Sequence, residues 1–76
     1  MKPSLKWKGT QGGFTWANAG RMELQCGRKW YPSGPFIGSC AWLHLETLAC
    51  ESQEAAQVAI EEAVRKALTD AQAAFL

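Results

Sequence analysis

The sequence lacks long apolar runs. No segment approaches the roughly 20 consecutive apolar residues that a membrane-spanning helix needs. The start of the chain, Lys2 to Lys6, leads into Trp7 without the apolar core of a signal peptide. These two absences predict a soluble protein of the cytoplasm.

Cysteine and histidine are also scarce, and their spacing argues against metal and nucleophile chemistry. The three cysteines, Cys26, Cys40 and Cys50, are odd in number and form no CxxC pair. His44 is the only histidine, and on a strand it would lie about 13 Å from Cys40, too far for both to bind one ion. No cysteine or serine has an evident base beside it. We therefore expect no enzyme activity, no metal and no cofactor, with the cysteines buried in the core.

Glycine and proline are absent from residues 46–76, and this absence divides the chain in two. Residues 1–45 contain all four tryptophans and carry six Lys or Arg against one Glu, whereas residues 46–76 carry six acids against Arg65 and Lys66. The first composition is typical of short strands with tight turns, and the second of one helix. At 76 residues the chain should form a single domain, residues 1–76, with a thin core.

The first half indicates an antiparallel meander. The alternation of Leu5 to Lys8 predicts a half-buried strand, and Gly9 to Gly13 predicts the turn after it. Phe14–Ala17 and Arg21–Cys26 predict further strands, and the inward positions of the second are Met22, Leu24 and Cys26. The predicted fold is α+β, an antiparallel sheet of three to five strands over about residues 4–46.

The last predicted strand runs from Phe36 or Ser39 to Glu46. Its apolar positions, which should face the helix, are Ala41, Leu43 and Leu45. Because side chains alternate along a strand, Trp42 would then lie on the uncovered face with Cys40, His44 and Glu46. This prediction makes Trp42 the centre of the expected working surface.

A single C-terminal helix over about residues 52–74 should cover one face of the sheet. Ser52 is the expected N-cap, and Glu54 lies in the first turn, where the positive end of the helix favours an acid. At 100° per residue, one apolar stripe contains Ala56, Ile60, Ala63, Val64, Ala67, Ala71, Ala74 and Phe75. The opposite face carries Glu61 and Glu62, each placed to pair with a cation four residues later.

Basic and aromatic residues of the first half form the candidate partner-binding set. This set is Lys6, Lys8, Arg21, Arg28, Lys29, Trp30, Tyr31, Trp42 and His44. Interleaved cations and rings can bind single-stranded nucleic acid through phosphate contacts and base stacking. Trp, Tyr and Arg also anchor protein interfaces, and small sheets use tryptophan as core filler with lysine on edge strands. The residues alone leave these interpretations open.

The pattern as a whole resembles one class of small proteins. The residues that carry the resemblance are Leu5-x-Trp7, Gly20-x-Met22-x-Leu24, Trp30, Gly38-Ser39-Cys40-Ala41, and Ser52 followed by Ala55-Ala56. This order is similar to that of short phage and prophage proteins in which strands precede an alanine-rich helix. Several phage proteins of this size are anti-CRISPR or other anti-defence inhibitors that occlude a host complex, so the resemblance implies such an inhibitor in the cytoplasm of a host bacterium.

Three functions are therefore expected from the sequence. The leading hypothesis is a non-catalytic, phage-type protein that inhibits a bacterial defence or nucleoprotein complex by occlusion. The alternatives are a single-stranded nucleic-acid binding module and a small phage structural or assembly subunit. A homodimer is also expected, because one helix covers only one face of the sheet and the other face, or an edge strand, could attract a second copy.

Overall fold

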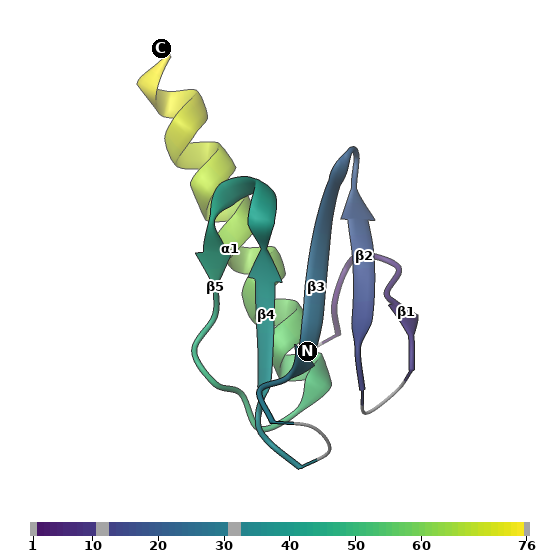
Figure 1. The fold of residues 1–76 in the computed structure, drawn as a ribbon. Helices are drawn as coiled ribbons and strands as arrows, with labels where there is room; N and C mark the ends of the chain where they lie inside the picture. The colour runs from purple at the N-terminus through teal and green to yellow at the C-terminus, as the bar shows by residue number, and fades with distance from the viewer. Residues whose placement is uncertain (1, 11–12, 31–32, 76) are drawn as a thin grey trace.

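The computed structural model describes residues 2–10, 13–30 and 33–75. Within these ranges it contains a five-stranded antiparallel sheet in the order β1-β2-β3-β4-β5, with one helix on one face (Figure 1). The elements are β1 Lys8–Gly9, β2 Thr15–Ala19, β3 Met22–Arg28, β4 Phe36–Cys40, β5 Leu45–Glu46 and α1 Gln53–Ala74. The predicted α+β fold, a meander followed by a single C-terminal helix, is confirmed.

The inward face of the sheet follows the period of two along each central strand. Its buried residues are Thr15 and Ala17 on β2, Leu24 and Cys26 on β3, and Phe36, Gly38 and Cys40 on β4. These positions pack against Ala56, Ile60 and Val64 of α1. The predicted inward phase of Met22, Leu24 and Cys26 is therefore confirmed, with Met22 half-buried at the end of its strand.

Helix α1 begins where the sequence predicts. The Ser52 Oγ accepts a hydrogen bond from the Ala55 N–H at 3.1 Å, and Glu54 lies in the first turn. The helix approaches the sheet most closely at Gly38, where a Cβ would lie 2.6 Å from the Ala56 carbonyl oxygen. Glycine on β4 and alanine on α1 thus bring the two layers into backbone contact.

The last predicted strand is interrupted, which contradicts the expected continuous run to Glu46. Residues Ala41–Leu43 form a single 3-10 turn, and His44 has a φ of 54° in the left-handed region. The chain therefore reverses, and β5 returns antiparallel beside Ser39 and Cys40.

This reversal changes the predicted orientation of several side chains. Cys40, expected on the uncovered face, is fully buried against α1, and Ala41, expected to face the helix, is exposed. Leu43 and Leu45 pack against the core as predicted, and Glu46 lies on the uncovered face opposite Ser39. The predicted orientations of Cys40 and Ala41 were wrong because side chains alternate between faces only within one strand, and the turn at residues 41–44 ends that alternation.

The first strand is also shorter than predicted, because the preceding residues bind to the helix. Only Lys8 and Gly9 pair with β2. The Glu61 carboxylate accepts hydrogen bonds from the Ser4 N–H at 2.7 Å, the Leu5 N–H at 2.9 Å and the Trp7 Nε1–H at 2.9 Å. Glu61, predicted on the solvent face of α1, is therefore buried.

The predicted ion pairs on α1 form in part. Arg65 Nη2 lies 3.9 Å from Glu61 Oε1, as the spacing predicts. Lys66 pairs with Asp70 at 3.0 Å in place of the expected Glu62. Both pairs have an exposed cation, so each contributes little to stability.

Candidate binding surfaces

The face of the sheet opposite α1 carries one row of side chains that crosses every strand. Strand register aligns Lys8, Trp16, Gln25, Ser39 and Glu46. Residues that pair across strands place their side chains on the same face. The row therefore begins with a lysine at the β1 edge and ends with a glutamate at the β5 edge, so this face carries both signs of charge.

Two aromatic rings lie together on this uncovered face. Phe14 and Trp16 are 50% and 36% exposed, and their ring centroids are 5.9 Å apart with the planes inclined by 29°. Phe14 extends over Gly27, where a Cβ would contact its ring at 3.5 Å. Ile37 stands opposite Gly27 on β4. We call Phe14, Trp16 and Ile37 the aromatic patch.

Polar side chains surround the aromatic patch. Asn18 on β2 stands opposite Glu23 on β3. The Gln25 amide donates a hydrogen bond to Glu23 at 3.1 Å, which orients both side chains along β3. The patch is therefore an apolar centre beside hydrogen-bonding groups, the arrangement typical of a protein interface.

The sequence prediction of binding residues did not include Phe14 or Trp16. Their phase could not be assigned, because Phe14 to Ala17 alternates large aromatic with small residues and either set can face a core. In the structure Thr15 and Ala17 are buried, and Thr15 Oγ1 accepts hydrogen bonds from Gln53 and Gln57 of α1, so the two rings lie on the other face.

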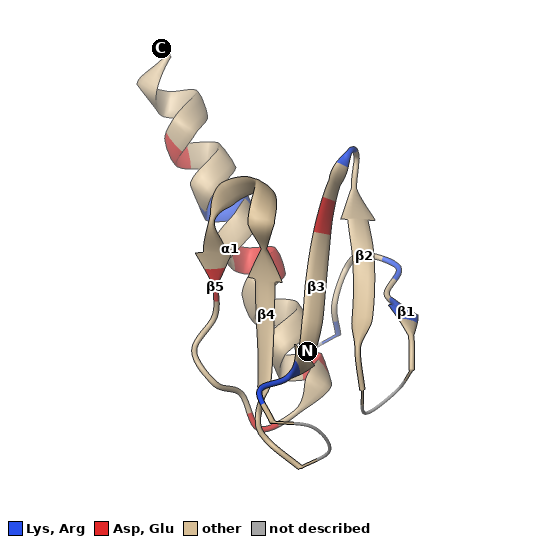
Figure 2. Ribbon diagram, viewed as in Figure 1, with Lys and Arg blue, Asp and Glu red and all other residues tan. Residues whose placement is uncertain are grey.

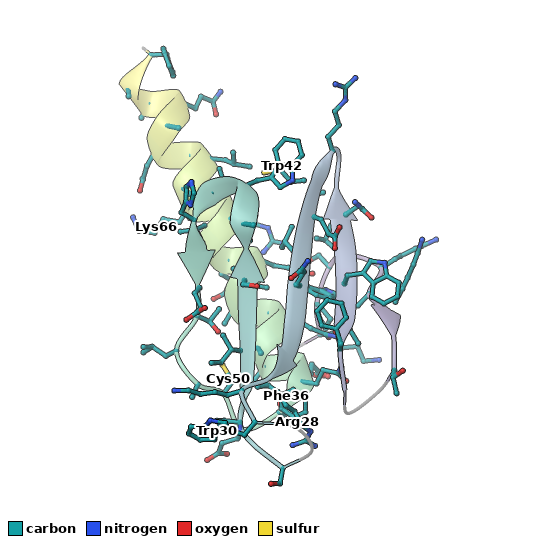
Figure 3. The ribbon with its side chains drawn as sticks, in the orientation of Figure 1. Arg28, Trp30, Phe36, Trp42, Cys50 and Lys66 are labelled. Atoms are coloured by element: carbon teal, nitrogen blue, oxygen red, sulfur yellow. The ribbon has the colours of Figure 1, made fainter. Side chains whose placement is uncertain are left out.

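Three residues of the predicted set lie at one end of the sheet. Arg21 is in the β2–β3 turn, and Trp42 and His44 are in the β4–β5 turn (Figures 1 and 3). The Ala41–Leu43 turn contacts β3, so the two turns belong to one end of the molecule. Trp42 is 62% exposed, in agreement with the predicted exposure, although it stands on a turn and not on a strand.

Three other predicted residues lie at the opposite end. The Arg28 guanidinium lies 4.4 Å from the centroid of the Phe36 ring, and its Nη1 donates to the Gly34 carbonyl at 2.9 Å. Lys29 Nζ lies 5.0 Å from the ring centroid of the exposed Trp30. Arg28 thus closes the lower end of the core (Figure 3). The remaining member of this group, Tyr31, lies outside the described residues.

Lys6 and Lys8 lie at a third place, the β1 edge. They line a shallow depression with Ser4, Leu5 and Asn18. Lysine and arginine are therefore distributed over separate parts of the molecule (Figure 2). The structure does not gather the predicted set into one basic stripe.

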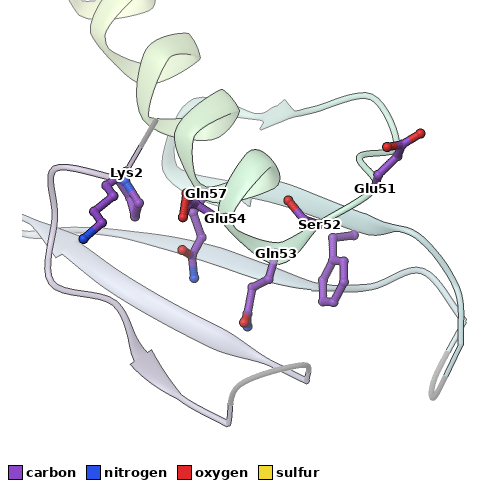
Figure 4. A pocket seen from close by; sticks show the side chains of 8 residues that line it. Lys2, Glu51, Ser52, Gln53, Glu54 and Gln57 are labelled. Carbon is purple, nitrogen blue, oxygen red and sulfur yellow. The ribbon is translucent and has the colours of Figure 1, made fainter.

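A broad cavity of about 640 Å³ lies at the start of α1 (Figure 4). It is lined by Lys2, Pro3, Phe36, Glu51, Ser52, Gln53, Glu54 and Gln57. The amides of Gln53 and Gln57 both donate to Thr15 Oγ1, at 3.3 Å and 3.0 Å. These hydrogen bonds fix the two glutamines to the sheet.

Two of the three cysteines are core residues. Cys26 and Cys40 are buried and Cys50 is half-buried. Burial raises the pKa of the Cys26 thiol from 9.0 to about 11, nearness to Cys50 adds to this, and a hydrogen bond with Thr15 opposes it. Among the described residues, no three His, Cys, Asp or Glu side chains are grouped so that they could hold a metal ion. Over the same ranges, no helix is long and apolar enough to cross a membrane.

The chain matches no protein-family model, no curated protein and no solved structure.

Proposed function

We propose that this protein is a non-catalytic binding protein whose working surface is the aromatic patch on the uncovered face of the sheet. The observation that supports this function is the stacked Phe14–Trp16 pair, half-exposed at the start of β2. Rigid aromatic side chains lose little conformational entropy on binding, and they dominate the energetics of protein interfaces.

A protein partner fits this surface better than a nucleic acid. The cross-strand row ends in Glu46 on β5. A second carboxylate, Glu23 on β3, lies on the same face, two residues before Gln25 of the row. Nucleic-acid binding draws its affinity from an excess of cations against phosphates, and two carboxylates on the same face oppose it. Charges of both signs around an apolar centre favour a protein surface of complementary charge.

In the setting that the sequence resemblance implies, the partner is a bacterial defence or nucleoprotein complex. The protein would be a phage-type inhibitor that acts by occlusion, since a bound protein of this size covers a surface that the complex needs. Such a mechanism requires an exposed anchor and no catalytic group.

The test is affinity capture from bacterial lysate with the tagged chain, with and without nuclease. We expect a nuclease-resistant protein partner with the wild type. Trp16→Ala should lose this partner, while the matched control Trp30→Ala, an exposed tryptophan at the end of the sheet, should keep it. Equal loss with both variants, or capture that disappears with nuclease, would contradict the proposal.

Single-stranded nucleic acid is the second candidate, and one observation favours it. Lys8 stands directly opposite Trp16, so a phosphate contact could accompany base stacking on the ring. Binding to an oligonucleotide, followed by tryptophan fluorescence, should then weaken with salt by a log–log slope of about −0.7 for each phosphate contact. Lys8→Ala should reduce the slope by one such contact, and a lack of binding at low salt would remove this candidate.

A further inference from the structure

The apolar stripe of α1 extends beyond the sheet. Ile60 and Val64 are buried against the strands, and at 100° per residue the same stripe continues through Leu68, Ala71 and Phe75. Leu68 is 46% exposed and Phe75 is 90% exposed. Figure 1 shows the end of α1 running past the β4–β5 turn. One face of the helix is thus covered by the sheet along its first half and exposed along its second half. We call the second half, residues 67–75, the overhang.

A small cavity opens where the covered half meets the overhang. Its volume is about 120 Å³, and its apolar lining is Leu5, Ala19, Leu24, Val64 and Leu68. Glu61 and Arg65 complete the lining, and the Glu61 carboxylate is already bonded to the N–H groups of Ser4 and Leu5. An apolar cavity of about 150 Å³ can hold a whole benzene ring, so this one, at about 120 Å³, can take part of an aromatic ring.

The overhang carries an aromatic side chain at the spacing from this cavity that a twofold pair requires. Phe75 follows Leu68 by seven residues, which is two helical turns, so both project from one face. In an antiparallel pair of α1 helices, Phe75 of each copy lies opposite Leu68 of the other, with the small Ala71 next to the axis. A surface that holds both the projection and its recess is complementary to itself, as an isologous interface demands.

Charge on the overhang permits this approach. Lys66 is paired with Asp70 at 3.0 Å, and no charged side chain follows within residues 71–75. Two copies therefore meet without net repulsion.

We propose that the overhang is a homodimer interface in which Phe75 of one copy enters the cavity beside Leu68 of the other. The occupant is a second copy of this chain, and the interface is separate from the aromatic patch that is proposed to bind the partner. The uncovered sheet face and the edge strands thus remain free in the dimer.

Sedimentation velocity of the full chain over a wide concentration range tests this interface. We expect a concentration-dependent dimer that Phe75→Ala weakens about tenfold or more, with the melting temperature at low concentration unchanged. Trp16→Ala should leave the dimer intact, and Phe75→Ala should still capture the partner, so failure of this inference and failure of the proposed function are distinguishable. A monomer at every concentration would overturn the proposal.

A cross-linking pair identifies the face involved even if the dimer is weak. Ala71→Cys lies next to the proposed axis and should form an intermolecular disulfide under mild oxidation. Thr69→Cys, on the opposite face of α1, is the matched control and should cross-link far more slowly. Equal rates of cross-linking, or a dimer that Phe75→Ala leaves unchanged, would contradict the interface.

Discussion

At the scale of single residues, Glu61 joins the start of the chain to the helix. Its buried carboxylate accepts hydrogen bonds from the backbone N–H groups of Ser4 and Leu5 and from the indole N–H of Trp7. These donors would otherwise need a strand partner or water. One side chain of α1 therefore anchors the start of the chain across the edge of the core.

Glu61→Ala should lower the free energy of unfolding by about 3 kcal/mol, because it leaves these donors without their charged acceptor. Glu62→Ala is the matched control, since this neighbour is exposed, and it should change the stability by less than about 0.5 kcal/mol. Chemical denaturation of both variants measures the difference. Similar values for the two would mean that the anchor contributes nothing to the fold.

Cys26 links stability to pH on the alkaline side. Its pKa rises from 9.0 to about 11 on folding, first because the thiol is buried. Since the unfolded chain loses this proton at lower pH than the folded chain, the contribution is fully present below pH 9 and is lost as pH rises toward 11. Melting curves should show a steeper loss of stability over this window in the wild type than in Cys26→Ala.

The half-buried Cys50 should react with alkylating reagents in the native state before Cys26 does.

At the scale of elements, the contact of α1 with β4 sets the spacing of the two layers. A Cβ on Gly38 would lie 2.7 Å from Ile60 Cβ as well as close to the Ala56 carbonyl oxygen. Gly38→Ala should therefore displace the helix and cost about 1–3 kcal/mol. Ser39→Ala, the next residue on the uncovered face, should be nearly neutral in the same thermal unfolding measurement. A neutral Gly38→Ala would show that the layers move apart without loss.

The β4–β5 turn separates an exposed residue from a core residue within two positions. Trp42 is exposed, whereas Leu43 packs against the cluster that contains Leu24 and Ile60. Trp42→Ala should change the unfolding free energy by less than about 0.5 kcal/mol, while Leu43→Ala should lower it by about 1–2 kcal/mol. The opposite order of the two values would mean that the orientation of this turn is wrong.

At the scale of the whole molecule, the two ends of the described chain differ in their contribution to the fold. The molecule measures 45 × 23 × 21 Å, and its elongation fits the overhang of α1. A chain that ends after Thr69 should keep its melting temperature at low concentration to within a few degrees, because residues 70–75 are exposed. Removal of residues 1–7 should instead unfold or strongly destabilise it, because Leu5 and Trp7 pack on the core.

The fold class and most element positions of this protein follow from local patterns in its sequence. Strand and helix periods are local properties, so the alternation of Met22, Leu24 and Cys26 and the stripe of α1 were visible without any tertiary contact. The N-cap at Ser52 was equally local, since its hydrogen bond spans one turn. The absence of glycine and proline after residue 45, together with the apolar stripe and the N-cap, predicted one long helix.

The orientation of Cys40, Glu61 and the Phe14–Trp16 pair depends instead on contacts and turns that no local pattern reveals. Cys40 faces the core because a reversal at His44 resets the strand phase, and one positive φ leaves no periodic signal. Glu61 is buried because its donors lie at the other end of the chain. The Phe14–Trp16 pair is exposed because Thr15, which lies between them in the sequence, bonds to Gln53 and Gln57 of α1 and so takes the inward face.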